Sequence, residues 1–309
     1  MAETVTIGFD IGGTNMRAGV VTAAGTIVES LQVDVPHTSD DLERGMKTMV
    51  DTLRSRHDVS AVGVAVAGFL DPDCEIVRFA PHLPWREYPA RQRLESLLEL
   101  PVRLEHDANS AAWGEYVFGG AQGYDNWVLF AIGTGIGATI VSDGKIYRGM
   151  GTAPEFGHLP VIPHGRHCAC GKQGCLERYA SGTALEHTAQ ERLAENPSIQ
   201  TSLRNERISG KTVVQHARAG DTFALEVVKD FSYWLGIGLS IVADVLDPPL
   251  ILLGGGVSQE HDLFLADAKA VMASSIVGAG YRPLPKVAAA KLGADAGMIG
   301  VANLARQAL

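Results

Sequence analysis

A strand, a glycine turn and two further strands occur in the same order twice in this sequence, and this repeat constrains the fold more than any other feature. Residues 5–10 predict a strand that continues through a glycine-rich turn into strands at 17–22 and 26–33. The pattern recurs from residue 128, with Ala131 in the position of Asp10. Any two β-meanders look somewhat alike, but glycine turns at both tips favour a duplication.

The segments around these meanders predict an α/β chain of two related domains. An apolar run at 61–67 is typical of a strand that is buried on both faces. A helix is expected at 40–56, with Ser39 or Asp40 as its N-cap. The C-terminal half is expected to be mostly helical around one strand at 250–253. Its helices are predicted near 181–196, 222–245, 263–275 and 294–308.

Net charge and hydropathy exclude several classes of function. Lys and Arg total 26 against 35 for Asp and Glu, a formal charge of −9, so the chain has no general attraction for nucleic acid or anionic membranes. No stretch reaches the roughly 18 to 20 apolar residues of a membrane span. The first six residues lack the basic start and apolar core of a secretory signal. We therefore expect a cytoplasmic protein.

Three glycine-rich turns each follow a predicted strand and could bring backbone N–H groups close to phosphate oxygens. The first also carries Asp10, whose carboxylate could hold magnesium through water, and Arg17 nearby adds positive charge. None fits the Walker or dinucleotide-binding pattern. Together the turns resemble the phosphate-1, phosphate-2 and adenosine motifs of the actin-like ATPase and sugar-kinase superfamily. The residues expected to bind ATP are Asp10, Gly12, Gly13, Thr14, Asn15, Arg17, Gly133, Thr134, Gly135, Gly137, Gly254, Gly255 and Gly256.

Three of the four cysteines, Cys168, Cys170 and Cys175, lie within eight residues. This spacing predicts a structural zinc site, with bystander thiols or a strained disulfide as the alternatives. Tetrahedral zinc needs a fourth ligand, and spacing alone does not choose among the nearby histidines at 158, 164 and 167. Cys74 stands apart and is expected to be an incidental loop residue.

With these motifs assembled, nearly the whole chain resembles the ROK family of sugar kinases, and within it the glucokinases of actinobacterial type. The junction of Glu-x-Gly-His with the cysteine run is highly specific. The resemblance rests on Asp10-Ile-Gly-Gly-Thr14, Glu105-His-Asp-Ala-Asn109, Gly133-Thr-Gly135, Glu155-Phe-Gly-His158, Cys168-x-Cys-Gly-x-x-Gly-Cys175-Leu-Glu177 and Leu253-Gly-Gly-Gly-Val257.

The resemblance implies a duplicated actin-like ATPase (ribonuclease H-like) sugar-kinase fold with two lobes around a cleft. The small lobe would comprise residues 1–118 and 291–309, and the large lobe residues 119–290. The first would carry the phosphate-1 motif and the catalytic residue, and the second the phosphate-2, zinc and adenosine motifs. It also implies ATP, Mg²⁺ and structural Zn²⁺ as cofactors and a homo-oligomer, a dimer or tetramer, as the assembly.

The resemblance further implies roles for single residues. Asp107 matches the catalytic base, which would take the proton from the sugar hydroxyl that receives phosphate. His158 matches both a sugar ligand and the histidine that completes the zinc site. Two positions depart from the family, because His106 and His82 stand where Asn is usual. The residues expected to bind sugar are Gly68, His82, His106, Asp107, Glu155, His158 and Glu177.

Simpler interpretations remain for these residues when each is taken alone. Taken alone, Asp107 is better explained as a helix cap, and Glu155 and Glu177 as solvated charges.

The function that the resemblance implies is ATP-dependent phosphorylation of glucose at the 6-hydroxyl. The alternatives are another acceptor such as mannose or N-acetylmannosamine, polyphosphate as the donor, or a sugar-responsive regulator. The last is weakened by the acidic charge and by a phosphate motif near residue 1, which is expected to leave no room for a DNA-binding domain.

Overall fold

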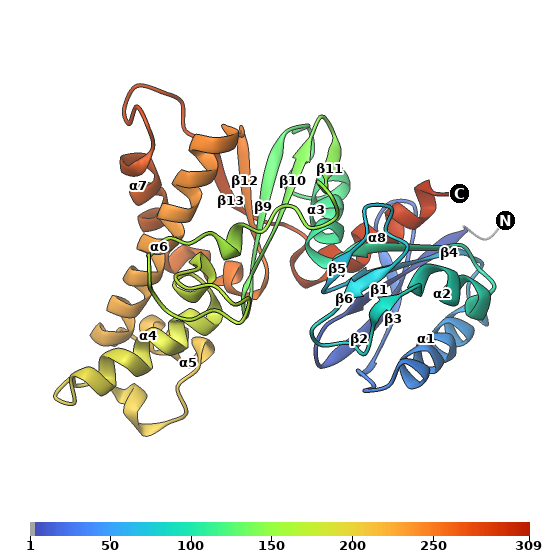
Figure 1. Cartoon of the computed structure of the whole chain (residues 1–309), viewed down its shortest axis with the longest axis horizontal. Helices are drawn as coiled ribbons and strands as arrows, with labels where there is room; N and C mark the ends of the chain where they lie inside the picture. Colours follow the sequence, from blue (N-terminus) through green and yellow to red (C-terminus); the bar gives the residue numbers. More distant parts are fainter. Residues whose placement is uncertain (1–3) are drawn as a thin grey trace. The chain divides into compact units, whose positions relative to one another are not determined.

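The computed structural model describes residues 4–309, which form two compact units (Figure 1). The first unit holds the chain up to residue 125 together with residues 139–154 and 291–309, and the second holds 126–138 and 155–290. The lobe boundaries expected from the sequence, at 118 and 290, stay a prediction. No helix within residues 4–309 is both long and apolar enough to span a membrane. Residues 1–3, on which the prediction about a secretory signal partly depends, lie outside the described part.

The first unit is built on a five-stranded sheet with the order β3-β2-β1-β4-β8. β1 pairs antiparallel with β2 and parallel with β4, and β4 pairs parallel with β8. The parallel strands are apolar along most of their length because helices cover both faces of the sheet. The strands are β1 (Val5–Ile11), β2 (Asn15–Val21), β3 (Ile27–Asp34), β4 (Val59–Val66) and β8 (Val102–His106).

Helices α1 (Ser39–Arg54) and α2 (Ala90–Leu98) contribute to one buried core with this sheet. The N-cap of α1 is Thr38, whose hydroxyl accepts a hydrogen bond from the backbone N of Asp41. The predicted cap at Ser39 or Asp40 is therefore wrong. Thr38 is the last residue with extended backbone angles, and a capping side chain must come from that position.

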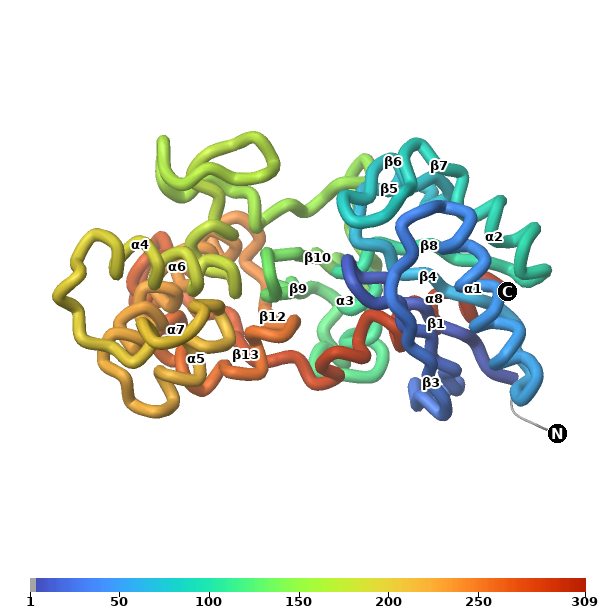
Figure 2. The backbone as a smooth tube through the Cα atoms, turned by 90° about the horizontal axis from the view of Figure 1, so that it is seen from below, coloured from blue at the N-terminus to red at the C-terminus, as the bar shows by residue number. Residues whose placement is uncertain are grey.

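A row of glycines explains how the C-terminal helix α8 (Ala296–Gln307) lies directly on the sheet. Gly8, Gly19 and Gly63 face one another across β2, β1 and β4. A Cβ atom on Gly8 would lie 2.1 Å from the carbonyl oxygen of Met298, and one on Gly63 would lie 2.1 Å from a carbonyl of the same helix. Only glycine allows this approach. Figures 1 and 2 both show α8 beside the blue strands, next to α3 (Asp107–Phe118).

The second sheet has the order β11-β10-β9-β12-β13, which repeats the order of the first. β12 pairs parallel with both β9 and β13, as β4 does with β1 and β8. The predicted duplication is thus seen in the strand order, and β10 is the strand at which the chain passes between the two units. The strands are β9 (Trp127–Ile132), β10 (Ile136–Ser142), β11 (Lys145–Tyr147), β12 (Leu250–Gly254) and β13 (Lys286–Ala289).

Helices make up most of the second unit, as predicted. The long α6 packs against α4, α5 and α7. The helices are α4 (Gly182–Glu195), α5 (Gly210–Arg218), α6 (Thr222–Leu246) and α7 (Leu265–Ser275). Short 3₁₀ helices lie at η1 (Phe156–His158), η2 (Leu176–Arg178), η3 (Ser202–Asn205), η4 (Gly256–Leu263) and, in the first unit, η5 (Gly293–Asp295).

Two predictions about strands were incomplete. The C-terminal half has a second strand, β13, which the sequence analysis missed because its four residues show no clear alternation. A three-stranded sheet in the first unit was missed for the same reason, since its strands have two or three residues each. These strands are β5 (Phe69–Leu70), β6 (Val77–Phe79) and β7 (Arg86–Tyr88).

Candidate active site

Asp10 and Asp107 lie at the carboxyl ends of β1 and β8, two strands of the parallel part of the first sheet. Ligand sites of α/β sheets are commonly found at this edge. Burial, followed by the charge of Asp107, raises the pKa of Asp10 to about 6, and Arg17 opposes the shift. The structure therefore brings the predicted base and the predicted magnesium residue close enough to interact.

Asp107 is the first residue of α3, and its side chain is 45% exposed. Its Oδ1 accepts a hydrogen bond of 2.7 Å from the backbone N of Ala108. The predicted helix start is confirmed, but the cap position falls on His106, whose side chain makes no capping bond. The His106 Nε2 lies 3.3 Å from Asp107 Oδ1. A carboxylate at a helix N-terminus is stabilised by the orphan N–H groups there.

The first glycine turn closes the hairpin between β1 and β2 with a hydrogen bond from the Gly12 N to the Asn15 carbonyl oxygen. A Cβ on Gly13 would lie 3.2 Å from the His82 ring, so the segment that carries this predicted sugar-binding residue touches the turn. The predicted ATP-binding role of Arg17 stays a prediction, and in the structure its guanidinium pairs with Asp295 at 2.6 Å. The structure thus gives Arg17 a partner within the protein.

Gly68, the predicted site of backbone approach to the sugar, lies in close contact with β6 and the residue after it. A Cβ there would lie 2.6 Å from the Phe79 carbonyl oxygen and 2.8 Å from the Ala80 Cα. This position therefore excludes any side chain larger than hydrogen.

A buried ionic network behind Asp107 was missed by the sequence analysis. Glu105 has a side chain that is 1% exposed and pairs with Arg148. Its Oε1 also accepts from the Asn109 Nδ2 at 2.9 Å and from the His106 N at 3.1 Å. Burial alone would raise the pKa of Glu105, but the bonds from Arg148 and Asn109 and the charges of Arg148 and Arg103 hold it below its usual value.

Cys74 belongs to this network, and the prediction that it is an incidental loop residue was wrong. Its side chain is buried, and its Sγ lies 3.9 Å from Glu105 Oε1. Burial, with the charge of Glu105, raises the pKa of this thiol to about 11. The turn that carries Cys74 therefore packs inward, although its sequence has the polar composition of an exposed loop.

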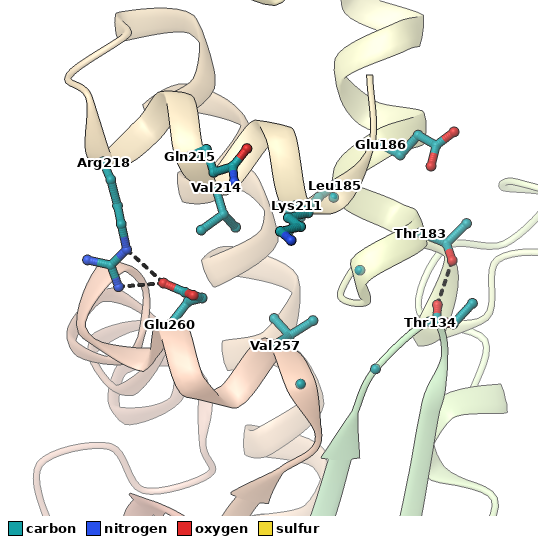
Figure 3. Close-up of a pocket in the computed structure, with 14 residues that line it drawn as sticks. Thr134, Thr183, Leu185, Glu186, Lys211, Val214, Gln215, Arg218, Val257 and Glu260 are labelled. Carbon is teal, nitrogen blue, oxygen red and sulfur yellow. Dashed lines mark hydrogen bonds and ion pairs between the residues drawn. The ribbon is translucent and has the colours of Figure 1, made fainter. Parts of the chain in front are cut away.

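In the second unit a cavity of about 690 Å³ opens beside the second glycine turn (Figure 3). Gly133, Thr134 and Gly256 line it, three residues predicted to bind ATP. Thr183 fixes the turn by donating its hydroxyl to the Thr134 carbonyl oxygen at 2.6 Å, and the Gly182 N donates to the Gly133 oxygen at 2.8 Å. Of the other predicted ATP residues in this unit, Gly135, Gly137, Gly254 and Gly255 do not line the cavity.

Helix α5 forms a wall of this cavity that the sequence analysis missed. Ser209 caps α5 by a reciprocal capping box with Thr212, and this Ser-Gly-Lys-Thr run is the signal that could have located the helix start. Arg218 at its end pairs with Glu260 of η4 across the cavity rim (Figure 3). The additional lining residues are Gly182, Thr183, Leu185, Glu186, Gly210, Lys211, Val214, Gln215, Arg218, Val257 and Glu260.

His158, Cys168, Cys170 and Cys175 come together, with their ligand atoms all within 4.8 Å of one another. The Cys168 Sγ lies 3.6 Å from the His158 Nδ1, and the Cys170 and Cys175 sulfurs are also 3.6 Å apart. A tetrahedron with zinc–sulfur bonds of about 2.3 Å has edges of about 3.8 Å, so the donor set fits zinc. The sulfur separation also excludes a disulfide between Cys170 and Cys175.

The arrangement distinguishes the three nearby histidines. His158 turns its Nδ1 toward the cysteines, while its Nε2 lies 3.8 Å from Glu155 Oε2. His167 instead lies 3.4 Å from the Gln173 amide, and His164 is outside the cluster. A histidine that bound metal through Nδ1 would keep Nε2 free for a second partner, as the double role predicted for His158 requires.

Glu177, predicted to bind a sugar hydroxyl, has another partner in the structure. Its Oε2 accepts a hydrogen bond of 3.0 Å from the backbone N of Ile136, in the second glycine turn. Its Oε1 lies 3.6 Å from the Cys168 Sγ. A Cβ on Gly135 would lie 2.1 Å from this carboxylate, so glycine at 135 makes room for Glu177.

Duplicated five-stranded sheets, glycine turns after β1, β9 and β12, and an acidic pair at the carboxyl ends of β1 and β8 define an α/β protein of the actin-like ATPase and sugar-kinase class. The chain belongs to the ROK family, whose model matches residues 6–308. It is 39% identical to the glucokinase of Streptomyces coelicolor over 98% of each chain. It is 34% identical to that of Halalkalibacterium halodurans, over 99% of this chain and 96% of the relative.

A solved structure agrees with these sequence similarities. The ROK family glucokinase from Streptomyces griseus, in complex with glucose and AMPPNP, superposes with a TM-score of 0.87 at 41% identity. The match covers 98% of this chain and 99% of that one. The predicted family and fold class are both confirmed.

Proposed function

We propose that this protein transfers the γ-phosphoryl group of ATP to glucose, giving glucose 6-phosphate and ADP. The observation that carries the proposal is the similarity along the whole chain to a glucokinase crystallised with glucose and an ATP analogue. The cavity beside the second glycine turn supports it from the structure, because its volume suits a nucleotide base and ribose.

ATP would enter the cavity of the second unit with its phosphates near the backbone of Gly133 and Thr134, where N–H groups of a glycine turn suit phosphate oxygens. The family resemblance also implies phosphate contacts for Asp10 and the amides of the first glycine turn. Magnesium bound near Asp10 through water would neutralise phosphate charge. Asp10 has the carboxylate that such a cation prefers.

Asp107 would act as the general base. Its carboxylate accepts the hydroxyl proton of glucose as the hydroxyl oxygen forms its bond to the γ-phosphorus. The bond from that phosphorus to the bridging oxygen breaks, and ADP leaves. The half-exposed Asp107 side chain at the start of α3 is accessible for this task.

The sugar would be held by Glu155, His158 and Glu177, with His106, His82 and Gly68 near its remaining hydroxyls. Neutral histidine has one N–H donor and one acceptor nitrogen, whereas the family's Asn has two N–H donors and an acceptor oxygen. Structural zinc on His158, Cys168, Cys170 and Cys175 would fix the loop that carries the glutamates. A homo-oligomeric assembly stays a prediction.

The proposal is tested by ADP release over a panel of sugars, with polyphosphate replacing ATP in a parallel series. Glucose should stimulate release most. A preference for mannose or N-acetylmannosamine, or efficient use of polyphosphate, would replace part of the proposal. If no sugar stimulates release and the protein retards a DNA probe in a sugar-dependent manner, the regulator alternative is correct.

The assignment of the base has its own test. Asp107→Asn keeps the helix start but removes the proton acceptor, so kcat should fall by at least about a hundredfold. Asp125→Asn is the matched control, because this exposed aspartate of the same unit accepts a hydrogen bond from the Tyr116 hydroxyl and belongs to none of the predicted sites. Turnover near the parent value for Asp107→Asn would refute the assignment.

A further inference from the structure

We propose that Glu177 couples the Cys/His cluster to the second glycine turn, so that the metal content of the cluster sets the affinity for nucleotide. The Cys/His cluster here means His158, Cys168, Cys170 and Cys175. The inference rests on the proposed function, since it takes the cavity beside Gly133 to be the nucleotide site. It gives Glu177 a positioning role in addition to sugar binding.

The carboxylate of Glu177 joins two parts of the second unit that are distant in sequence. One oxygen accepts the backbone N–H of Ile136 at 3.0 Å, and the other lies 3.6 Å from the Cys168 sulfur. Glu177 itself follows Cys175 by two residues, in the short helix η2. A movement of either cysteine is therefore passed directly to the carboxylate.

The glycine turn at residues 133–136 closes on itself through the bond from the Gly133 N to the Gly135 oxygen, and groups on two sides hold it from outside. On one side α4 anchors it through the bonds that Gly182 and Thr183 donate to the Gly133 and Thr134 oxygens. On the other side Glu177 anchors the N–H of Ile136. Gly133 and Thr134 line the cavity, so loss of the Glu177 anchor frees the part of the turn that faces a nucleotide.

The space around Glu177 leaves no substitute for its carboxylate. Gly135 passes so close that a Cβ would meet the Glu177 Oε2 at 2.1 Å. Leu176, the preceding residue, is fully buried and packs onto Gly238 of α6. This contact fixes the backbone of η2. The position of the Glu177 carboxylate is thus set by its own backbone and by the Cys/His cluster. Because this carboxylate bonds the Ile136 N–H, a shift of the cluster also shifts the turn.

Metal removal should loosen this connection. Four donor atoms within 4.8 Å of one another would be held together by a bound cation, and without it the thiols have only weak mutual attraction. A hydrogen bond of 3.0 Å weakens steeply when its atoms move apart by about half an ångström. The simplest alternative is that zinc only stabilises the loop at 158–175 and that the cavity is indifferent to it.

The experiment is calorimetric titration of AMPPNP with Mg²⁺ and without sugar, for protein that is loaded with zinc or stripped by a zinc-selective chelator. In the parent protein, stripping should weaken AMPPNP binding at least fivefold. Glu177→Ala should bind AMPPNP at the weakened level already, and stripping should change it less than twofold. Glu177→Gln keeps an oxygen that can accept from Ile136 and should retain most of the affinity.

Asp230→Ala is the matched control, because this carboxylate of the same unit pairs with Arg192, and neither residue lines the cavity or belongs to the Cys/His cluster. Its AMPPNP affinity should match the parent's and should respond to stripping in the same way. The proposal is overturned if stripping leaves the parent's affinity within twofold, or if Glu177→Ala still responds to stripping as the parent does.

Hydrogen exchange provides a second measurement that requires no nucleotide and no variant. Stripping should speed exchange in peptides that cover 133–137 and leave β12 (Leu250–Gly254) unchanged. Unchanged exchange at 133–137 overturns the coupling. Glucose phosphorylation by the parent protein is measured on the same preparations. If the protein does not phosphorylate glucose, the proposed function is refuted. If it does, but zinc removal leaves AMPPNP binding unchanged, only the coupling is refuted.

Discussion

Replacing Arg148 by Met should destabilise the first unit strongly, because it leaves the buried Glu105 carboxylate without its main partner. Glu105 is almost fully buried, and Arg148 contacts both of its oxygens. Removing one member of a buried ion pair costs about 3–5 kcal/mol. In a unit of about 160 residues, each kcal/mol lowers Tm by about 2–4 °C, so Arg148→Met should lower Tm by about 6–20 °C.

The assay is thermal unfolding at neutral pH, followed by circular dichroism, with two comparison variants. Lys47→Met removes an exposed ion pair to Asp51, with side chains 42% and 53% exposed, and should change stability by at most about 1 kcal/mol. The double variant Glu105→Gln with Arg148→Met leaves no buried charge unpaired and should recover most of the loss. A Tm for Arg148→Met within about 2 °C of the Lys47→Met value would refute the reasoning.

The pH dependence of the same pair has a definite sign. Arg148 and its neighbours hold the pKa of Glu105 below its usual value despite burial. A carboxylate with a depressed pKa in the folded state contributes stability above its unfolded pKa and loses it as the pH falls through the folded pKa. The difference in free energy of unfolding between the parent and the double variant should therefore shrink in acid. The decrease should occur at pH values below the usual pKa of a glutamate.

Three further predictions follow from single contacts. Because the pKa of Asp10 is raised to about 6, the rate of ADP release at limiting Mg²⁺ should fall as the pH drops through 6 and should recover with excess Mg²⁺. A flat pH profile from 5 to 7 would contradict a role of Asp10 in magnesium binding. Gly300→Ala would place a Cβ 1.8 Å from the Ser110 carbonyl oxygen and should cost at least about 1–3 kcal/mol in thermal unfolding. Gly297→Ala on the same helix meets nothing nearer than 4.0 Å and should be neutral or stabilising, and equal effects would disprove the argument. Cys175→Ser should abolish zinc binding in metal analysis whereas Cys74→Ser should not, and a full zinc content in Cys175→Ser would exclude Cys175 as a ligand.

The parts of the fold that could be predicted from sequence are those with a local signal. Each glycine turn marks the end of a strand, and β1, β9 and β12 do end within a residue or two of the predicted positions. The strand β13 has no such signal, because four residues become a strand only when β12 lies beside them. Local pattern thus located the glycine turns but not the outer strand of the sheet.

The contacts that were missed connect residues far apart in sequence. Glu105 looks like an ordinary strand residue until Arg148, 43 residues later, reaches it. Helix α5, which forms a wall of the cavity, likewise begins 77 residues after Gly133. Side-chain periodicity carries no information about such pairs, because burial of a charge is decided by what packs on it.

The two copies of the meander share a strand order but carry different side chains at matched positions, and this divergence separates their chemistry. Where the first copy has Gly8, which lets α8 lie on the sheet, the second has the buried Leu129, which contacts Gly254. Where the first has Asp10, the second has Ala131, paired in register with Gly254. An acidic residue at the end of β1 therefore has no counterpart at the end of β9, where the strand end stays apolar and the glycine turn that follows faces a cavity. One topology thus carries an acidic pair, for which we propose cation binding and proton transfer, at one sheet edge, and a cavity, for which we propose nucleotide binding, at the other.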